Sequence, residues 1–327
     1  MRIQDLVATA TNKDQFPDLQ AYIDFSLRFL EYIGEERNRQ AVVVSQNENI
    51  YRFYQFTEDA GFAVSRPFNS ELLYTADDAE AAYEQFIDDM GVLERNREDA
   101  LIEDPAVINR SVYTIQQSVG FALDAGIGRG LEPNTSRKIN GDLFERLVLL
   151  TVRSLGVNCV SGTVNIPVLL DGKKVCGAQF QHDMIVTDEA GNLKILGSVK
   201  TTSKDRITKV FADKFLYARL TETDIPHIAI VLHDVQRANT RNRAENEYNI
   251  SATFLPGHFK AYTVKLNPLD GVYYCDLRPN MKSDALLRKH INRFDVLLTH
   301  DVWKFLSREM QPPAIPPVLL GRTEAES

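Results

Sequence analysis

Two oppositely charged side chains lie in neighbouring apolar stretches, Asp183 in Gln-His-Asp-Met-Ile-Val and Lys200 in Leu-Gly-Ser-Val-Lys, 17 positions apart. Between them, residues 188–192 contain the Gly and Asn expected of a hairpin connection. A twisted hairpin brings both side chains to its open end. An acid and an ammonium there can hold a metal ion and a water beside a phosphodiester. In the alternative interpretation, Asp183 only caps a strand or forms a structural ion pair with Lys200.

The segments around this pair predict the elements that position it. An Asp171-Gly172 turn of hairpin type joins the first two strands, and Asn140 or Asp142 is a candidate helix cap. The last strand is continuously apolar, as expected of a strand buried on both faces. The predicted order is a helix, a three-strand meander, a helix and a strand, at residues 143–155, 157–169, 175–187, 193–200, 207–220 and 227–232. This order predicts an α/β fold with a mixed β-sheet flanked by helices.

The N-terminal part is predicted to be mostly helical. Apolar residues recur at three- and four-residue intervals in 19–33 and 77–90, and Asp104-Pro105 begins a further helix through about 119. The apolar stretches near 41–45 and 51–56 are short strands or buried turns. A segment rich in Gly, Pro and Asn, 125–136, is the best boundary. It divides the chain into 1–125 and 126–327, the second ending in a helical segment and a tail.

Charge is distributed unevenly between these two parts. Residues 1–125 contain 23 Asp and Glu against 10 Lys and Arg, a net charge of −13. The remaining residues contain 22 acids and 27 bases, a net charge of +5. The second part is therefore compatible with a polyanionic partner that the first part repels. A chance imbalance between two solvated surfaces is the alternative.

The composition limits the cellular class. No apolar run approaches the ~18 residues that span a bilayer, and the first residues lack the charged-then-apolar order of a signal peptide. The three cysteines, Cys159, Cys176 and Cys275, are widely spaced and show no paired-ligand pattern. We expect a cytoplasmic protein with reduced thiols, without a membrane partner or structural zinc.

The order of elements, with Asp183 on the second strand and Ser198-Val199-Lys200 on the third, resembles the PD-(D/E)XK nuclease superfamily. Among its members the type II restriction endonucleases are the most similar. The resemblance covers roughly residues 138–232. His182 stands where the superfamily has proline and is interpreted as a packed strand residue. Ser198 stands where the triplet has Asp or Glu, which removes a metal ligand.

The EcoRII and NgoMIV groups of restriction enzymes resemble this chain in lacking the same acid. In those groups a carboxylate on the following helix replaces it, 12–13 residues beyond the lysine. Asp213 follows Lys200 with 12 intervening residues, although those groups usually have Glu there. They also contain a run similar to Lys200-Thr-Thr-Ser-Lys-Asp-Arg206. The resemblance therefore implies that the missing acid is supplied by the helix after the strand.

The resemblance also implies a role for each polar residue. Asp183 would be the main ligand of Mg²⁺, a hard cation that prefers oxygen ligands, and Asp213 or Glu145 would add a second acid. Lys200 would orient or help deprotonate the attacking water, or neutralise the scissile phosphate. Arg206 would grip a phosphate oxygen. Glu145, Asp213 and Arg206 can instead be ordinary surface charges.

Two further groups of residues are candidate DNA contacts. Ser203 and Lys204 lie within the matched run after Lys200. A polar segment, 236–247, follows the last apolar strand and contains residue types that read base edges. Its candidate residues are Arg237, Arg241, Asn242 and Arg243. A solvated loop is the alternative for this segment.

The leading hypothesis is a Mg²⁺-dependent type II restriction endonuclease that cuts both strands of a short double-stranded DNA site. Palindromic sites imply a homodimer or homotetramer, and a cognate DNA methyltransferase is expected in the same system. The N-terminal part would serve oligomerisation, effector binding, autoinhibition or DNA clamping. A repair or structure-specific nuclease and a catalytically decayed DNA-binding protein are the alternatives.

The C-terminal part predicts packing rather than chemistry. Apolar residues recur at helical spacing in 282–305, which indicates a helix that packs in the core or at a dimer surface. The Pro-rich stretch 311–317 is predicted to be an extended tail.

Overall fold

The computed structural model describes residues 1–35, 41–55, 64–127, 129–203, 206–238 and 248–321. Its centre is a mixed sheet with the strand order β11-β10-β7-β6-β5-β4-β12. An antiparallel meander of β4, β5 and β6 continues into three parallel strands, while β12 pairs antiparallel with β4. The strands are β4 Asn158–Leu170, β5 Lys173–Thr187, β6 Leu193–Thr202, β7 His227–His233, β10 Gly271–Tyr274, β11 Ile291–Arg293 and β12 Val318–Gly321.

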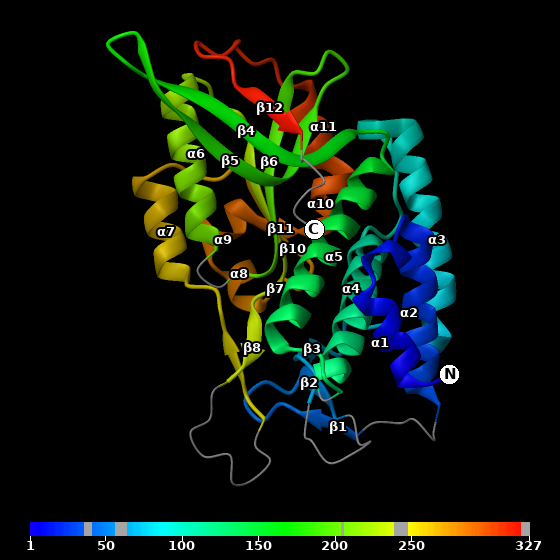
Figure 1. Ribbon diagram of the computed structural model, residues 1–327. Coiled ribbons are helices and arrows are strands. Elements are labelled where there is room, and N and C mark those ends of the chain that lie inside the picture. Colours follow the sequence, from blue (N-terminus) through cyan, green and yellow to red (C-terminus); the bar gives the residue numbers. More distant parts are fainter. Residues whose placement is uncertain (36–40, 56–63, 128, 204–205, 239–247, 322–327) are drawn as a thin grey trace.

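Helices cover both faces of this sheet (Figure 1). On one side lie α1 Ile3–Thr11, α2 Leu19–Gly34, α3 Ala76–Asn96, α4 Ala106–Ile127 and α5 Pro133–Arg153. On the other lie α6 Ile207–Thr221, α7 Pro256–Lys265, α8 Pro279–Ser283 and α9 Ala285–His290. The apolar stripes of α2 to α5 share one large buried cluster with one face of the sheet, while α6 and α7 pack on smaller clusters against the other. The fold is thus the predicted mixed sheet flanked by helices.

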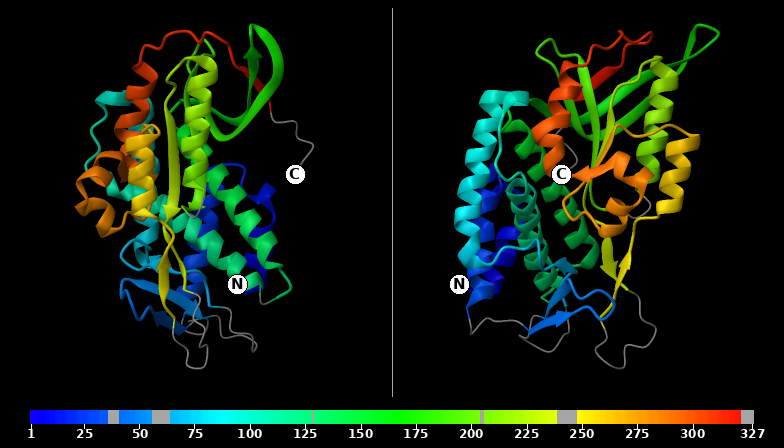
Figure 2. Two further views of the ribbon diagram at one scale, coloured as in Figure 1. Left: turned by 90° about the vertical axis from the view of Figure 1, so that its left-hand side faces the viewer. Right: turned by 180° about the vertical axis from the view of Figure 1, so that it is seen from behind.

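A second, smaller β-structure lies at the lower end of the molecule, as the three views of Figures 1 and 2 show. It consists of an antiparallel sheet, β1 Ala41–Val44, β2 Tyr51–Gln55 and β3 Phe68–Asn69, and a ribbon of β8 Val235–Arg237 and β9 Ile250–Ala252. Tyr51, Phe53 and Val64 share a buried cluster with Val235 and Ile250. The N-terminal part therefore packs directly on the ribbon that follows β7.

Two element predictions differ from the structure. The helix predicted at 143–155 begins at Pro133, because a proline in the first turn starts it after the N-cap Glu132, and it runs through both Asn140 and Asp142. The helix predicted in 282–305 is interrupted by β11. The pairing of β11 with β10 overrides the helical periodicity of the sequence there. After β11 the chain forms α10 Phe294–Val296, a π-helical turn Leu297–Asp301 and α11 Val302–Ser307. Most apolar residues of this segment, among them Ile291, Phe294 and Leu298, are nevertheless buried in the core, one of the two predicted settings.

The predicted boundary at 125–136 contains the connection between α4 and α5. The same large cluster of buried side chains includes residues on both sides of it, such as Phe121 and Leu147. Among the described residues, the helices are too short or too polar to cross a membrane. The Pro-rich segment 311–317 has no regular helix or strand and leads into β12.

Candidate active site

The β5–β6 pairing places Asp183 beside the end of β6. Met184 pairs with Gly197 across the two strands, and a side chain on Gly197 would bring its Cβ to 3.1 Å from the Met184 Cβ. Glycine therefore permits this close pairing. Next to the Met184–Gly197 pair, Asp183 Oδ2 accepts a hydrogen bond from the Val199 backbone N–H at 2.8 Å. The same oxygen accepts one from the Lys200 ammonium.

Glu145 adds a second carboxylate from the helix that covers this face. The Lys200 Nζ lies 3.3 Å from Glu145 Oε1, because α5 packs its Leu147 and Val148 in the same cluster as Val199. The side chains of Glu145, Asp183 and Lys200 remain 22%, 13% and 24% exposed. Two partly buried carboxylates thus converge on one ammonium that solvent still reaches.

The pKa of Glu145 is raised to about 7 in this setting. Burial is the largest cause, and the nearby charge of Asp183 adds to it, while Lys200 opposes the shift. A carboxyl with a raised pKa between an acid and an ammonium is typical of functional sites. A cation in this place would favour its ionised form.

We predict that wild-type stability falls from about pH 5 to about pH 8 relative to the Glu145→Gln variant. Because the folded pKa of about 7 exceeds the ordinary 4.5, the contribution of Glu145 is full below about pH 4.5 and is lost as pH rises through about 7. The free energy of unfolding should fall by roughly 2 kcal/mol over this range, which is less than the full pKa shift implies because solvent screens the partly exposed site. Thermal unfolding of both proteins in metal-free buffer measures it, and parallel pH profiles would contradict it.

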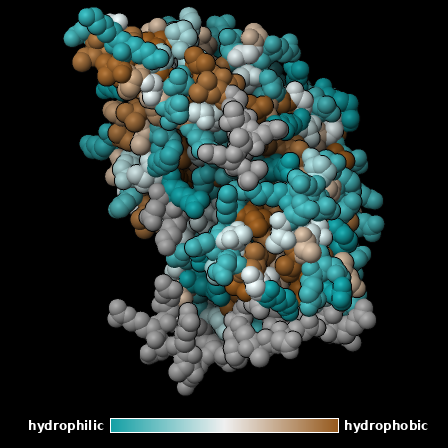
Figure 3. Space-filling view, in the orientation of Figure 1, coloured by the Kyte–Doolittle hydropathy of each residue, from teal (hydrophilic) through white to brown (hydrophobic). Residues whose placement is uncertain are grey.

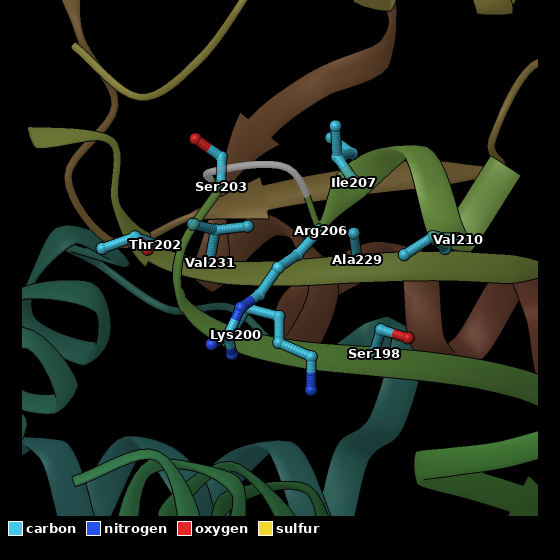
Figure 4. A pocket seen from close by; sticks show the side chains of 9 residues that line it. All are labelled: Ser198, Lys200, Thr202, Ser203, Arg206, Ile207, Val210, Ala229 and Val231. Atoms are coloured by element: carbon cyan, nitrogen blue, oxygen red, sulfur yellow. The ribbon is translucent and has the colours of Figure 1, made fainter. Parts of the chain in front are cut away.

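A shallow hollow opens beside Lys200 at the start of α6. Figure 4 shows Arg206 extending from the first turn toward Lys200, with Ser198 on the same strand. Val210, Ala229 and Val231 form its apolar wall. Arg206 is exposed, so its guanidinium is available to an anion that approaches Lys200.

Asp213 lies on α6 and forms an ion pair with Lys209, one turn earlier. Within the described part of the chain, no hydrogen bond or ion pair joins Asp213 to Asp183, Glu145 or Lys200. The structure thus brings Glu145, and not Asp213, into contact with the lysine. The four-residue spacing of Lys209 and Asp213 on a predicted helix is a signal from which this pair could have been predicted.

The predicted DNA contacts lie in different settings. Ser203 is buried and its hydroxyl shares a hydrogen bond of 3.0 Å with Thr253. Arg237 is exposed on β8 and donates to the Val64 carbonyl at 3.2 Å. The other four, Lys204, Arg241, Asn242 and Arg243, lie outside the described residues.

His182 is packed inside the protein, as the sequence interpretation has it. It is 3% exposed, and its ring lies against that of His227 with 5.9 Å between centroids. Burial, assisted by the charge of Lys209, lowers the pKa of His182 to about 4. A neutral buried imidazole supports the strand that carries Asp183.

Comparisons with known proteins bear on the fold. No protein-family model and no curated protein sequence matches the chain. The crystal structure of the type IIP restriction endonuclease Kpn2I is similar, with 15% identical residues, a TM-score of 0.66 and coverage of 93% of this chain and 97% of that one. A complex of the restriction endonuclease PspGI with substrate DNA is also similar, with 13% identity, a TM-score of 0.41 and coverage of 70% and 90%. The likeness to Kpn2I confirms the predicted restriction-endonuclease-like fold class.

Proposed function

We propose that this chain is a type II restriction endonuclease that uses Mg²⁺ to hydrolyse phosphodiester bonds in both strands of a short double-stranded DNA site. The observation that carries the proposal is the convergence of Asp183 and Glu145 on the Lys200 ammonium. Its position on the meander of a fold similar to Kpn2I supports the proposal. We also propose that Asp183, Ser198 and Lys200 form a variant PD-(D/E)XK motif in which Ser198 replaces an acid.

The donor set is compatible with Mg²⁺. This ion is usually held by one or two carboxylates, with waters and substrate phosphate oxygens completing the octahedron. Asp183 and Glu145 supply two carboxylates, and the described residues contain no cluster of three His, Cys, Asp or Glu that would form an all-protein site. Bound Mg²⁺ would lower the pKa of a water and offset negative charge on the phosphate.

The side chains of the chain itself have distinct roles in the proposal. Asp183, held by the Val199 N–H, is the main metal ligand, and Glu145 is the second. Lys200 orients the attacking water and offsets charge on the scissile phosphate. Arg206 holds a neighbouring phosphate oxygen from the start of α6. Asp213 would take the second position only if its carboxylate left the ion pair with Lys209.

The partners follow from the proposed substrate. A palindromic site requires two active sites related by a two-fold axis, so we propose a homodimer or homotetramer. A DNA methyltransferase of the same system would protect host DNA. The β8–β9 ribbon, with Arg237 at its end, is the proposed route to base edges.

Incubation of the protein with bacteriophage DNA and Mg²⁺ tests the proposal. We expect discrete fragments, no cleavage with excess EDTA, and recovery when Mg²⁺ is restored. A smear would indicate a nonspecific or structure-specific nuclease. Intact DNA that still forms a complex with the protein would indicate a decayed binder.

A further inference from the structure

Gly141 lies in the interior of α5 with open space around it. A Cβ built on Gly141 would meet no atom of the described residues within 4 Å. Two other glycines inside helices have a packing reason, because a Cβ on Gly120 would lie 2.4 Å from Arg66 and one on Gly126 would lie 2.9 Å from Val7. A helix-interior glycine costs about 1 kcal/mol relative to alanine. Packing among the residues that the structure describes does not explain this cost at Gly141.

The need for a hinge in α5 does not explain the glycine at position 141 either. Helix α5 runs without a break from Pro133 to Arg153. The buried Gln116 of α4 donates to both the backbone carbonyl and the side-chain oxygen of Asn140, at 3.1 and 3.0 Å. The helix is therefore held in place at the residue before Gly141. A partner that approaches this turn of α5 closely would account for the missing side chain.

Gly141 lies on the line of α5 that leads to the candidate active site. Residues at intervals of three and four share a helix face, so Lys138, Gly141 and Glu145 follow one another along it. The rise of 1.5 Å per residue places Gly141 about 6 Å and Lys138 about 10 Å before Glu145 along the axis. Lys138 is exposed and forms no ion pair with any described residue. We call Lys138 and Gly141 the bare face of α5.

We propose that the bare face of α5 is the surface on which the DNA backbone lies next to the scissile phosphate. Glycine lets a strand approach the helix backbone closely, and Lys138 meets a phosphate a few nucleotides away, since phosphates of one strand follow at about 3.4 Å along the duplex axis. The inference deepens the proposed function, on which it rests.

Substitutions at Gly141 should separate stability from DNA binding. Because the added side chain enters open space, Gly141→Ala and Gly141→Leu are expected to raise the Tm, alanine the most. Gly141→Leu should weaken DNA binding at least tenfold, and Gly141→Ala should weaken it by a smaller factor. The probe is a duplex cut from bacteriophage DNA around a wild-type cleavage position, in Ca²⁺ instead of Mg²⁺. Gly257→Leu, at an equally open glycine of α7, is the matched control and should bind normally.

Lys138→Gln supplies a second readout. If Lys138 meets a phosphate, the slope of log affinity against log salt should become shallower by about 0.9. Unchanged binding by Gly141→Leu, a lowered Tm, or an unchanged salt slope for Lys138→Gln would each overturn the inference. Wild-type cleavage with any of these results would leave the proposed function intact, whereas absent wild-type cleavage would remove the proposed function itself.

Discussion

Asp183→Asn is expected to lower DNA cleavage by about 10³-fold or more, the upper part of the range for one electrostatic group in an active site. The variant removes the negative charge proposed to hold Mg²⁺. Asparagine keeps an oxygen for the Val199 N–H, which donates to Asp183 at 2.8 Å. The fold should therefore lose only about 1–2 kcal/mol. Initial cleavage rates and thermal unfolding measure the two effects.

Asp188→Asn is the matched control in the same hairpin. Asp188 accepts backbone hydrogen bonds from Ala190 and Asn192 in the β5–β6 turn, and asparagine can still accept them. This variant should cleave at the wild-type rate. Cleavage by Asp183→Asn at a rate comparable to that of Asp188→Asn would show that the Asp183–Lys200 pair is only structural.

Glu145→Gln should lower cleavage by about 10²-fold, and Asp213→Asn by less than about tenfold. The reason is the geometry: Glu145 contacts Lys200, whereas Asp213 is paired with Lys209 on its own helix. Only the loss of Glu145 removes a carboxylate from the proposed metal site. Glu145→Gln should also require a higher Mg²⁺ concentration for half-maximal rate.

The two variants control each other, since each replaces a carboxylate by an amide on a helix beside β6. The reverse ranking would assign the second acid to α6, as the resemblance to the EcoRII and NgoMIV groups implies. Equal, small effects would exclude both residues as metal ligands.

The hairpin of Asp183 and Lys200 could be predicted because its strands and turn are local in sequence. The three-strand meander and the buried β7 follow from apolar runs and turn residues, and the structure has them at nearly the predicted limits. The choice between Glu145 and Asp213 could not be predicted. It depends on how α5 and α6 pack on opposite faces of the sheet, which no local pattern encodes.

The start of α5 was predicted wrongly for an instructive reason. Asn140, Gly141 and Asp142 have low helix propensity and together are typical of a helix start. In the structure Gln116 holds Asn140, and Lys13 pairs with Asp142, so tertiary contacts keep this turn helical. Local sequence and structure often disagree at functional sites, and here the disagreement centres on Gly141.

The most direct test of the account is to sequence the DNA ends that the wild-type protein produces from bacteriophage DNA in Mg²⁺. The account predicts one short, two-fold symmetric sequence at every break, cut in both strands at fixed positions, with no such ends from Asp183→Asn. Breaks at unrelated sequences, or the same ends from Asp183→Asn, would contradict it.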